Sequence, residues 1–334
     1  MIVAAVLISI AVVQSWVVWF SNSDHDKGSF LVNFKSWSFG GASPKPVSAN
    51  VLSPRDLTGS WLGNTWIPPY PWKHFSAEEM REIYGRRRTV WVGDETARRA
   101  AMTMFSVLNG TTVNVPVALA ESEIDINKRK ETETCPRWSK TLYTNEVYPV
   151  VSICRPVQPT GDLAMVSAVC LQHVKRLLSV EIERGGVITP SFDVMIVSLG
   201  IWHHTKESIC RLQAGETLTS LVQDISRLMH QLLASQPHLK FVWRTSGWIG
   251  TPMEQQQQVL EINKAIMDSV DNANNTQKQI SYVNWGGAME ARSFGYYRLG
   301  GNEKEVYDLE PRLALIQMIT NQLQSMEDTP SAAG

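Results

Sequence analysis

The stretch TVWVGDETARR, residues 89–99, decides the fold of this chain. Residues 89–92 are β-branched or aromatic, as in a buried strand, and Gly93-Asp94 interrupts that run. From position 95 onward, apolar residues recur at helical spacing, namely Ala97, Ala101, Met104, Phe105 and Leu108. The stretch therefore predicts a strand, a tight turn and a helix over 95–108. Position 95 then lies at a helix N-terminus beyond the carboxyl end of a strand, where open α/β sheets place their chemistry.

The same alternation recurs along the chain. Strand-like runs lie at 89–92, 193–198, 240–244 and 280–284, and helical patterns lie at 95–108, 216–235, 254–271 and 311–326. This alternation predicts an α/β fold in three layers, with a mainly parallel sheet flanked by helices on both faces. The stretch from 111 to 159 is less regular, so we expect insertions over the site there.

The composition fits one folded domain with appendages. The 334 residues are 43% hydrophobic and 19% charged, and the net charge of -1 gives no electrostatic basis for nucleic-acid binding. The four cysteines, Cys135, Cys154, Cys170 and Cys210, show no C-x-x-C spacing, so we expect no metal site, and we expect no cofactor. Two disulfides can form in an oxidising compartment, but the sequence leaves their pairing open.

An apolar segment precedes the domain. Residues 2–20 carry no charge, match the roughly 20 residues of a membrane-spanning helix and end in Trp16, Trp19 and Phe20, which suit an interfacial aromatic belt. A cleaved signal peptide is the alternative, but it requires a basic start and a small-x-small cleavage site. We therefore expect a transmembrane anchor over 1–20, a stem over 21–58, a domain over 59–326 and a disordered tail over 327–334. Two glycosylation sequons, at Asn109 and Asn274, suit a luminal or extracellular domain.

The turn and four other segments resemble one family. Residues 91–98 are similar to the first block of the SGNH/GDSL hydrolase superfamily, in particular to its PC-esterase or trichome-birefringence-like branch, whose pattern is Gly-Asp-Ser-x-x-Arg. Segments 61–69, 193–202, 242–247 and 282–287 also resemble this branch, in the expected order. The resemblance implies an SGNH-like domain with flavodoxin-like topology on a single-pass membrane protein facing the secretory (Golgi or ER) lumen, active in acyl transfer on polysaccharides.

The nucleophile position of that pattern holds Glu95. A carboxylate cannot be activated by proton removal, and it places negative charge where an oxyanion would develop. Thr96 is the nearest hydroxyl, but one step along a helix turns its side chain by roughly 100° away from the serine direction. As a plain structural alternative, Glu95 stabilises the first turn of a helix through the dipole.

The acid and the histidine of the triad are also replaced. In the run 301–311, the closest register to the family places Asn302 at the acid and Val306 at the histidine, and a slip of one residue would make the latter Tyr307. The run contains no histidine, and no histidine follows His238. A base from elsewhere would have to be His203 or His204, which follow a predicted strand and alternatively form a solvent-exposed pair. A metal site built from these histidines with Asp94 or Glu95 is a minor hypothesis, and paired-carboxylate hydrolysis a weaker one.

Parts of a pocket remain. Gly93 and Gly200 can present backbone N–H groups to a carbonyl or anion, and Asp94, Arg98 and Arg244 face the same edge of the predicted sheet. An ion pair within the fold is the simplest role for Arg98. The chain has 12 tryptophans. Those near 61–72, together with Tyr70, could stack on sugar faces or pack as a collar against the core.

Three functional hypotheses stay open. The first is a pseudoenzyme that has lost the triad and binds a glycan or a protein partner. The second is an active polysaccharide O-acetyltransferase or acetyl esterase that uses noncanonical residues such as Thr96 with His203 or His204. The third is a structural membrane protein that stabilises an enzyme. Loss of all three triad positions favours the first hypothesis.

Overall fold

The computed structural model describes residues 55–62, 65–110, 151–154, 162–183, 192–199, 210–247, 253–272, 279–290, 298–300, 304–306 and 309–327. All of them belong to one compact unit, Pro46–Gly334. No helix among these residues is long and apolar enough to span a bilayer. The apolar segment 2–20, most of the stem and the tail after residue 327 lie outside the described ranges.

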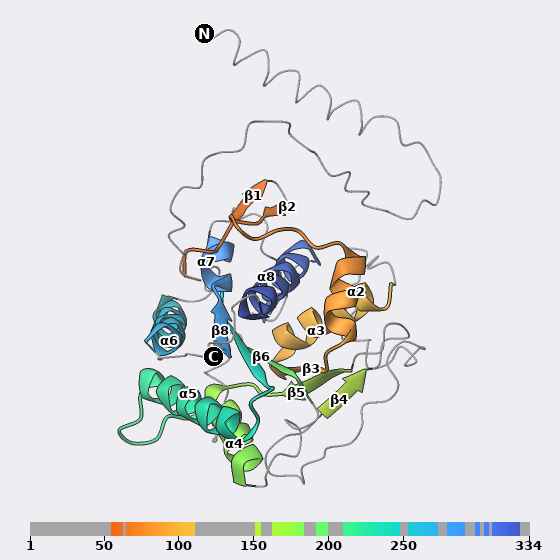
Figure 1. Cartoon of the computed structure of the whole chain (residues 1–334). Helices are drawn as coiled ribbons and strands as arrows, with labels where there is room; N and C mark the ends of the chain where they lie inside the picture. The colour runs from red at the N-terminus through yellow and green to blue at the C-terminus, as the bar shows by residue number, and fades with distance from the viewer. Residues whose placement is uncertain are drawn as a thin grey trace, which may run out of the picture. The chain divides into compact units, whose positions relative to one another are not determined.

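A six-stranded sheet forms the centre of this unit (Figure 1). Its strands, in spatial order, are β4 (Val151–Cys154), β5 (Leu163–Ser167), β3 (Thr89–Gly93), β6 (Val194–Ser198), β7 (Lys240–Arg244) and β8 (Ile280–Val283). Every neighbouring pair is parallel except β4 with β5. Numbered along the chain, the five parallel strands run in the order 2-1-3-4-5, which is the flavodoxin-like order. The parallel α/β fold predicted from the sequence is confirmed.

Helices cover both faces of the sheet, as the three-layer prediction requires. On one face the core contains residues of α4 (Leu171–Glu183), α5 (Leu218–Ser235) and α6 (Met253–Asp271). On the other face it contains residues of α2 (Ala77–Gly85), α3 (Glu95–Leu108), α7 (Trp285–Glu290) and α8 (Leu309–Glu327). Adjacent strand residues alternate between the two cores, since Val90 and Val92 face the first and Trp91 faces the second.

The aromatic segment ahead of the turn packs as a collar. It forms a small antiparallel ribbon of β1 (Ser60–Leu62) and β2 (Thr65–Ile67). Trp66 and Trp72 are buried, and the Trp66 indole N–H donates to the carbonyl of Thr58 at 2.9 Å. Of the two alternatives that the sequence leaves open for these rings, packing as a collar therefore describes Trp66 and Trp72. Tyr70, which lies between Trp66 and Trp72 in the sequence, is exposed, at 87%.

The folded part begins before residue 59. Leu57 is buried in the same core as α3 and α8, and Arg55 forms ion pairs with Asp268 and Asp271 of α6 at 2.9 and 3.1 Å. Arg55 and Leu57, which the sequence analysis assigns to the stem, therefore contact the domain. The predicted insertion 111–159 contains the edge strand β4, while residues 111–150 lie outside the described ranges. A second ribbon pairs β9 (Arg298–Gly300) with β10 (Lys304–Val306).

Candidate functional site

The strand order directs attention to the carboxyl ends of β3 and β6. In the sheet, β3 lies between β5 and β6. After β3 the chain continues to β5 on one side, and it then adds β6 on the other side of β3. The direction in which strands are added therefore reverses between β3 and β6. Open α/β sheets bind ligands in the crevice at such a reversal, outside the carboxyl ends of the strands. The last residues of three neighbouring strands, Gly93, Ser198 and Arg244, lie in register there. The turn predicted from the sequence as the functional site is at this position.

Gly93 is required by packing. A Cβ at this residue would lie 1.9 Å from the carbonyl oxygen of Ser198 and 2.6 Å from the Cβ of Ala97. The first distance involves backbone, which has little room to shift. The carbonyl of Gly93 accepts a hydrogen bond from the amide of Ala168 at 2.7 Å. Close approach of β6 and α3 therefore explains this glycine without any catalytic role.

Asp94 caps helix α3. Its Oδ1 accepts hydrogen bonds from the amides of Thr96 at 2.9 Å and Ala97 at 3.4 Å, and its backbone is extended, as in an N-cap. Asp94 is 4% exposed. The carboxylate that the sequence placed in a pocket thus satisfies the free N–H groups of a helix terminus.

Thr96 is held between an anion and a cation. Its hydroxyl donates to Oδ1 of Asp94 at 2.7 Å and accepts from Nη2 of Arg244 at 3.0 Å. The side chain is 5% exposed. Glu95 is the first residue of α3, but its side chain is not among the described parts. Among the described atoms of this turn, the Thr96 hydroxyl is therefore already engaged as donor and as acceptor.

Arg244 ends β7 and reaches across β6 to the turn. Besides Thr96, its Nη2 donates to the carbonyl of Leu199 at 2.6 Å. The residue is 2% exposed, and its Nε lies buried without a hydrogen-bond partner. Buried polar groups in native proteins nearly always have a partner, so this N–H is an exception among the described residues at this edge of the sheet. Arg244 thus lies at the carboxyl end of β7, in contact with the β3–α3 turn.

Hydrogen bonds of Ser246 and Asn263, which the sequence analysis did not predict, hold the segment after β7. The Ser246 hydroxyl donates to the carbonyl of Leu199 at 2.5 Å, and its amide donates to Oδ1 of Asn263 at 2.8 Å. The Asn263 side chain returns a bond to the Ser246 carbonyl at 2.7 Å. The hydroxyl of Ser198 is buried without a partner, next to Arg244 in register. Two buried donors without acceptors thus lie on adjacent strands.

The other predicted site residues are only partly described. Arg98 is half-buried in the first turn of α3, where its amide donates to the carbonyl of Asp94 at 2.9 Å. Asn109 follows the last turn of α3, at the end of the helix opposite to the candidate site, and is half-buried. Val306 ends β10, but its side chain is not described. Outside the described residues lie Gly200, His203, His204, Asn274 and Asn302.

The likeness of this chain to known proteins is distant. No protein-family model matches the chain, and no curated protein matches it. Among solved structures, it is similar to a family two carbohydrate esterase from Clostridium thermocellum, determined in complex with cellohexaose. The identity is 9%, the TM-score is 0.35, and the match covers 72% of this chain but only 64% of the length of the esterase chain. At this identity the likeness concerns the fold alone.

Proposed function

We propose that this chain is a noncatalytic member of the PC-esterase or trichome-birefringence-like branch of the SGNH superfamily. In this proposal it is anchored in the membrane by residues 2–20, and its domain faces the secretory lumen. The crevice at the carboxyl ends of β3, β6 and β7 binds a polysaccharide or a glycoprotein glycan and does not cleave or acylate it.

The state of the Thr96 hydroxyl carries this proposal. A serine-type esterase needs a hydroxyl that meets both a base and the substrate carbonyl. The hydroxyl of Thr96 donates a hydrogen bond to Asp94 and accepts one from Arg244, and the residue is 5% exposed. Asp94 in turn is occupied as the helix cap. This arrangement supports a structural hydroxyl and disfavours the alternative in which Thr96 attacks an ester.

The sequence supports the same conclusion independently. Position 95, where the family pattern has serine, is glutamate, and no histidine follows His238. A complete triad contributes roughly a millionfold to kcat in a serine hydrolase, so its loss leaves little turnover.

Binding is supported by the unpartnered donors. The buried Nε–H of Arg244 and the buried hydroxyl of Ser198 lack acceptors. A hydroxyl or carbonyl oxygen of a bound glycan would satisfy both at a place where α/β sheets bind ligands.

Hydrolysis of an aryl acetate by the full chain tests the catalytic half of the proposal. We expect a rate equal to the buffer blank, and the same rate for Thr96→Val. The triple variant Glu95→Ser, Asn302→Asp, Val306→His is expected to gain turnover if the pocket is preserved. Turnover by the parent chain that disappears in Thr96→Val or His203→Ala would overturn the proposal.

Binding is tested separately on a glycan array with the full chain in detergent. We expect retention of polysaccharide or glycoprotein glycans and weaker retention by Arg244→Lys, because lysine has no Nε–H of guanidinium geometry. Circular dichroism spectra of both proteins provide the folding control. Absence of any retained glycan would leave the structural-partner hypothesis in its place.

A further inference from the structure

An exposed apolar patch lies on the collar, outside the candidate site. The large hydrophobic side chains that are exposed among the described residues are Leu62, Ile67, Tyr70, Leu212 and Leu260. The first three belong to the collar and are 68%, 41% and 87% exposed. Exposed apolar residues that occur singly are normal, whereas a group of them marks an interaction site. We refer to Leu62, Ile67 and Tyr70 as the collar patch.

The β1–β2 ribbon places Leu62 and Ile67 on one outer face. In the antiparallel register, Ile67 lies opposite Ser60 and Leu62 lies opposite Thr65. Side chains alternate between the two faces along a strand. Trp66 is 3% exposed and belongs to the core that α3 and α8 share, so the face with Leu62 and Ile67 points away from that core. These two residues are diagonal neighbours across the ribbon, a separation of roughly 7 to 8 Å.

Hydrogen bonds fix the collar to two helices. The Trp61 indole N–H donates to the carbonyl of Ala288 in α7 at 2.8 Å. Beyond Tyr70, the side chain of Asn321 in α8 accepts from the Lys73 amide at 2.9 Å and donates to the Lys73 carbonyl at 2.8 Å. The ribbon lies beside α7 and α8 in Figure 1. Because the collar is held on both sides of Tyr70, the patch is a fixed surface of the domain.

The chemistry of this stretch suits a lipid surface. Residues 57–75 contain no aspartate or glutamate, so no carboxylate of the stretch repels anionic headgroups. The side chains of Leu62 and Ile67 have no hydrogen-bonding group, as contact with acyl chains requires. A tyrosine ring such as that of Tyr70 has an apolar body and a polar tip, which is typical of residues at the membrane interface. A binding site for a sugar would instead need polar groups at defined positions.

The place of the patch along the chain indicates which partner covers it. Arg55 is the first described residue, and its ion pairs with Asp268 and Asp271 bring the chain onto the domain shortly before β1. The ribbon is thus the described element nearest in sequence to the proposed anchor at 2–20. A contact within one tethered assembly needs little affinity, since the tether raises the effective concentration. An interface with a second copy would need roughly 20–30 residues on each side, many more than the patch contains.

We propose that the collar patch inserts into the interfacial layer of the membrane that holds residues 2–20. Leu62 and Ile67 then contact acyl chains, and Tyr70 lies at the level of the headgroups. The contact restricts the orientation of the domain on the bilayer. This inference rests on the membrane anchor of the proposed function.

Quenching by lipid-bound groups in phosphatidylcholine nanodiscs tests the proposal on the full chain. An environment-sensitive fluorescent amino acid replaces Leu62, Ile67 or Leu212, one position at a time. Leu212 is the matched control, because it is 44% exposed but precedes α5, which covers the other face of the sheet. Interfacial side chains reach roughly 5 to 10 Å into the membrane, so doxyl groups on the acyl chains should quench the probes at 62 and 67 at least about twofold. The probe at 212 should fluoresce equally in plain and doxyl-containing discs.

Co-elution of the chain with the nanodiscs separates this proposal from the proposed anchor. A chain that co-elutes but shows no quenching at 62 and 67, or equal quenching at 212, keeps its anchor and overturns the membrane contact of the patch. A chain that does not co-elute overturns both. Emission that shifts to the blue at 62 without quenching would assign the patch to a protein partner and would also contradict the proposal. Circular dichroism shows whether each substituted chain folds, and the probe at 67 decides if the chain with the probe at 62 does not.

Discussion

Replacement of Thr96 by valine tests the network that links the turn to β7. Valine has nearly the shape of threonine, so the change removes the hydroxyl and creates no cavity. Two hydrogen bonds are lost, one to the Asp94 carboxylate at 2.7 Å and one from the Arg244 guanidinium at 3.0 Å. Hydrogen bonds to charged groups contribute about 1.5 to 3 kcal/mol each. Since Asp94 keeps two amide donors and Arg244 keeps the Leu199 carbonyl, we expect a net loss of about 3 kcal/mol.

The assay is urea unfolding followed by near-ultraviolet circular dichroism, with the slope m checked for constancy. Thr103→Val is the matched control. Thr103 is equally buried on the same helix, but its hydroxyl bonds only to the carbonyl of Arg99, one turn back. That bond joins neutral groups of one helix, so we expect a change below about 1 kcal/mol. A Thr96→Val loss no larger than the Thr103→Val loss would refute the argument that the hydroxyl bridges two charges.

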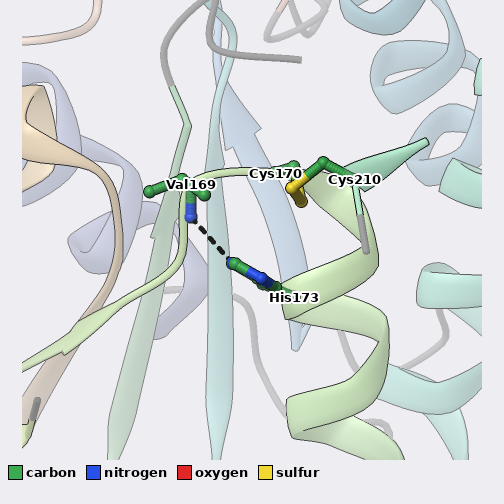
Figure 2. Close-up of a disulfide and its surroundings, with 4 residues drawn as sticks. All are labelled: Val169, Cys170, His173 and Cys210. Atoms are coloured by element: carbon green, nitrogen blue, oxygen red, sulfur yellow. Dashed lines mark hydrogen bonds between the residues drawn. A yellow bond between two sulfur atoms is a disulfide. The ribbon is translucent and has the colours of Figure 1, made fainter. Parts of the chain in front are cut away.

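Further predictions concern packing, the disulfide and pH. Gly93→Ala should prevent stable folding or lower the unfolding temperature sharply, because the new Cβ meets a backbone carbonyl at 1.9 Å; a normal melting curve would contradict this reason for the glycine. Cys170 and Cys210 form a disulfide across 40 residues (Figure 2), one of the pairings that the sequence left open. Cys170→Ser, which opens this loop, should lower the free energy of unfolding by about 4 kcal/mol in chemical denaturation. A loss below about 1 kcal/mol would show that the loop-closure argument fails here. The Asp224 pKa is lowered chiefly by its hydrogen bond from Lys175, and the Glu79 pKa chiefly by the backbone amide at its helix cap. The stabilisation from both carboxylates is complete above their ordinary pKa values of 3.8 and 4.5 and is lost as the pH falls through the lower folded values. Unfolding free energies measured from pH 6 downward should therefore decline below about pH 4.5, and a flat profile would contradict both assignments.

The bounds of helices and strands could be predicted well where residues in the local sequence mark the ends of the element. Helix α3 runs from Glu95 to Leu108 as the apolar spacing indicates, because Asp94 caps it and Gly93 ends the preceding strand. Strand β7 also matches its predicted range. Helix α5 begins at Leu218, two residues after the predicted start, since Thr217 serves as its N-cap in a capping box.

Other elements depended on contacts that no short pattern reveals. Strand β4 is four residues long and lies at the antiparallel edge of the sheet. Such a short segment has too few residues for a clear strand pattern, so its conformation depends on its pairing with β5. The burial of Trp66 depends on its indole bond to Thr58 and on the packing of the collar, since tryptophan patterns alone suit both a core and an exposed surface.

The candidate site could likewise be predicted only in part. The sequence predicted that the turn and Arg244 lie at one edge of the sheet, because both end parallel strands. It did not predict that Arg244 bonds to Thr96, a residue 148 positions away, since this contact depends on the registers of β3, β6 and β7. The partnership of Ser246 with Asn263 was missed for the same reason.

Covalent labelling measures the central claim most directly, namely that the β3–α3 turn holds no activated nucleophile. The full chain is incubated with a fluorophosphonate, which phosphonylates activated hydroxyls of serine hydrolases, and its intact mass is measured. A parallel sample of a serine esterase confirms that the reagent is active. We predict an unchanged mass, because the Thr96 hydroxyl is buried and bonded to Asp94 and Arg244. One added phosphonyl group per chain, mapped to the α3 peptide and absent in Thr96→Val, would contradict the account.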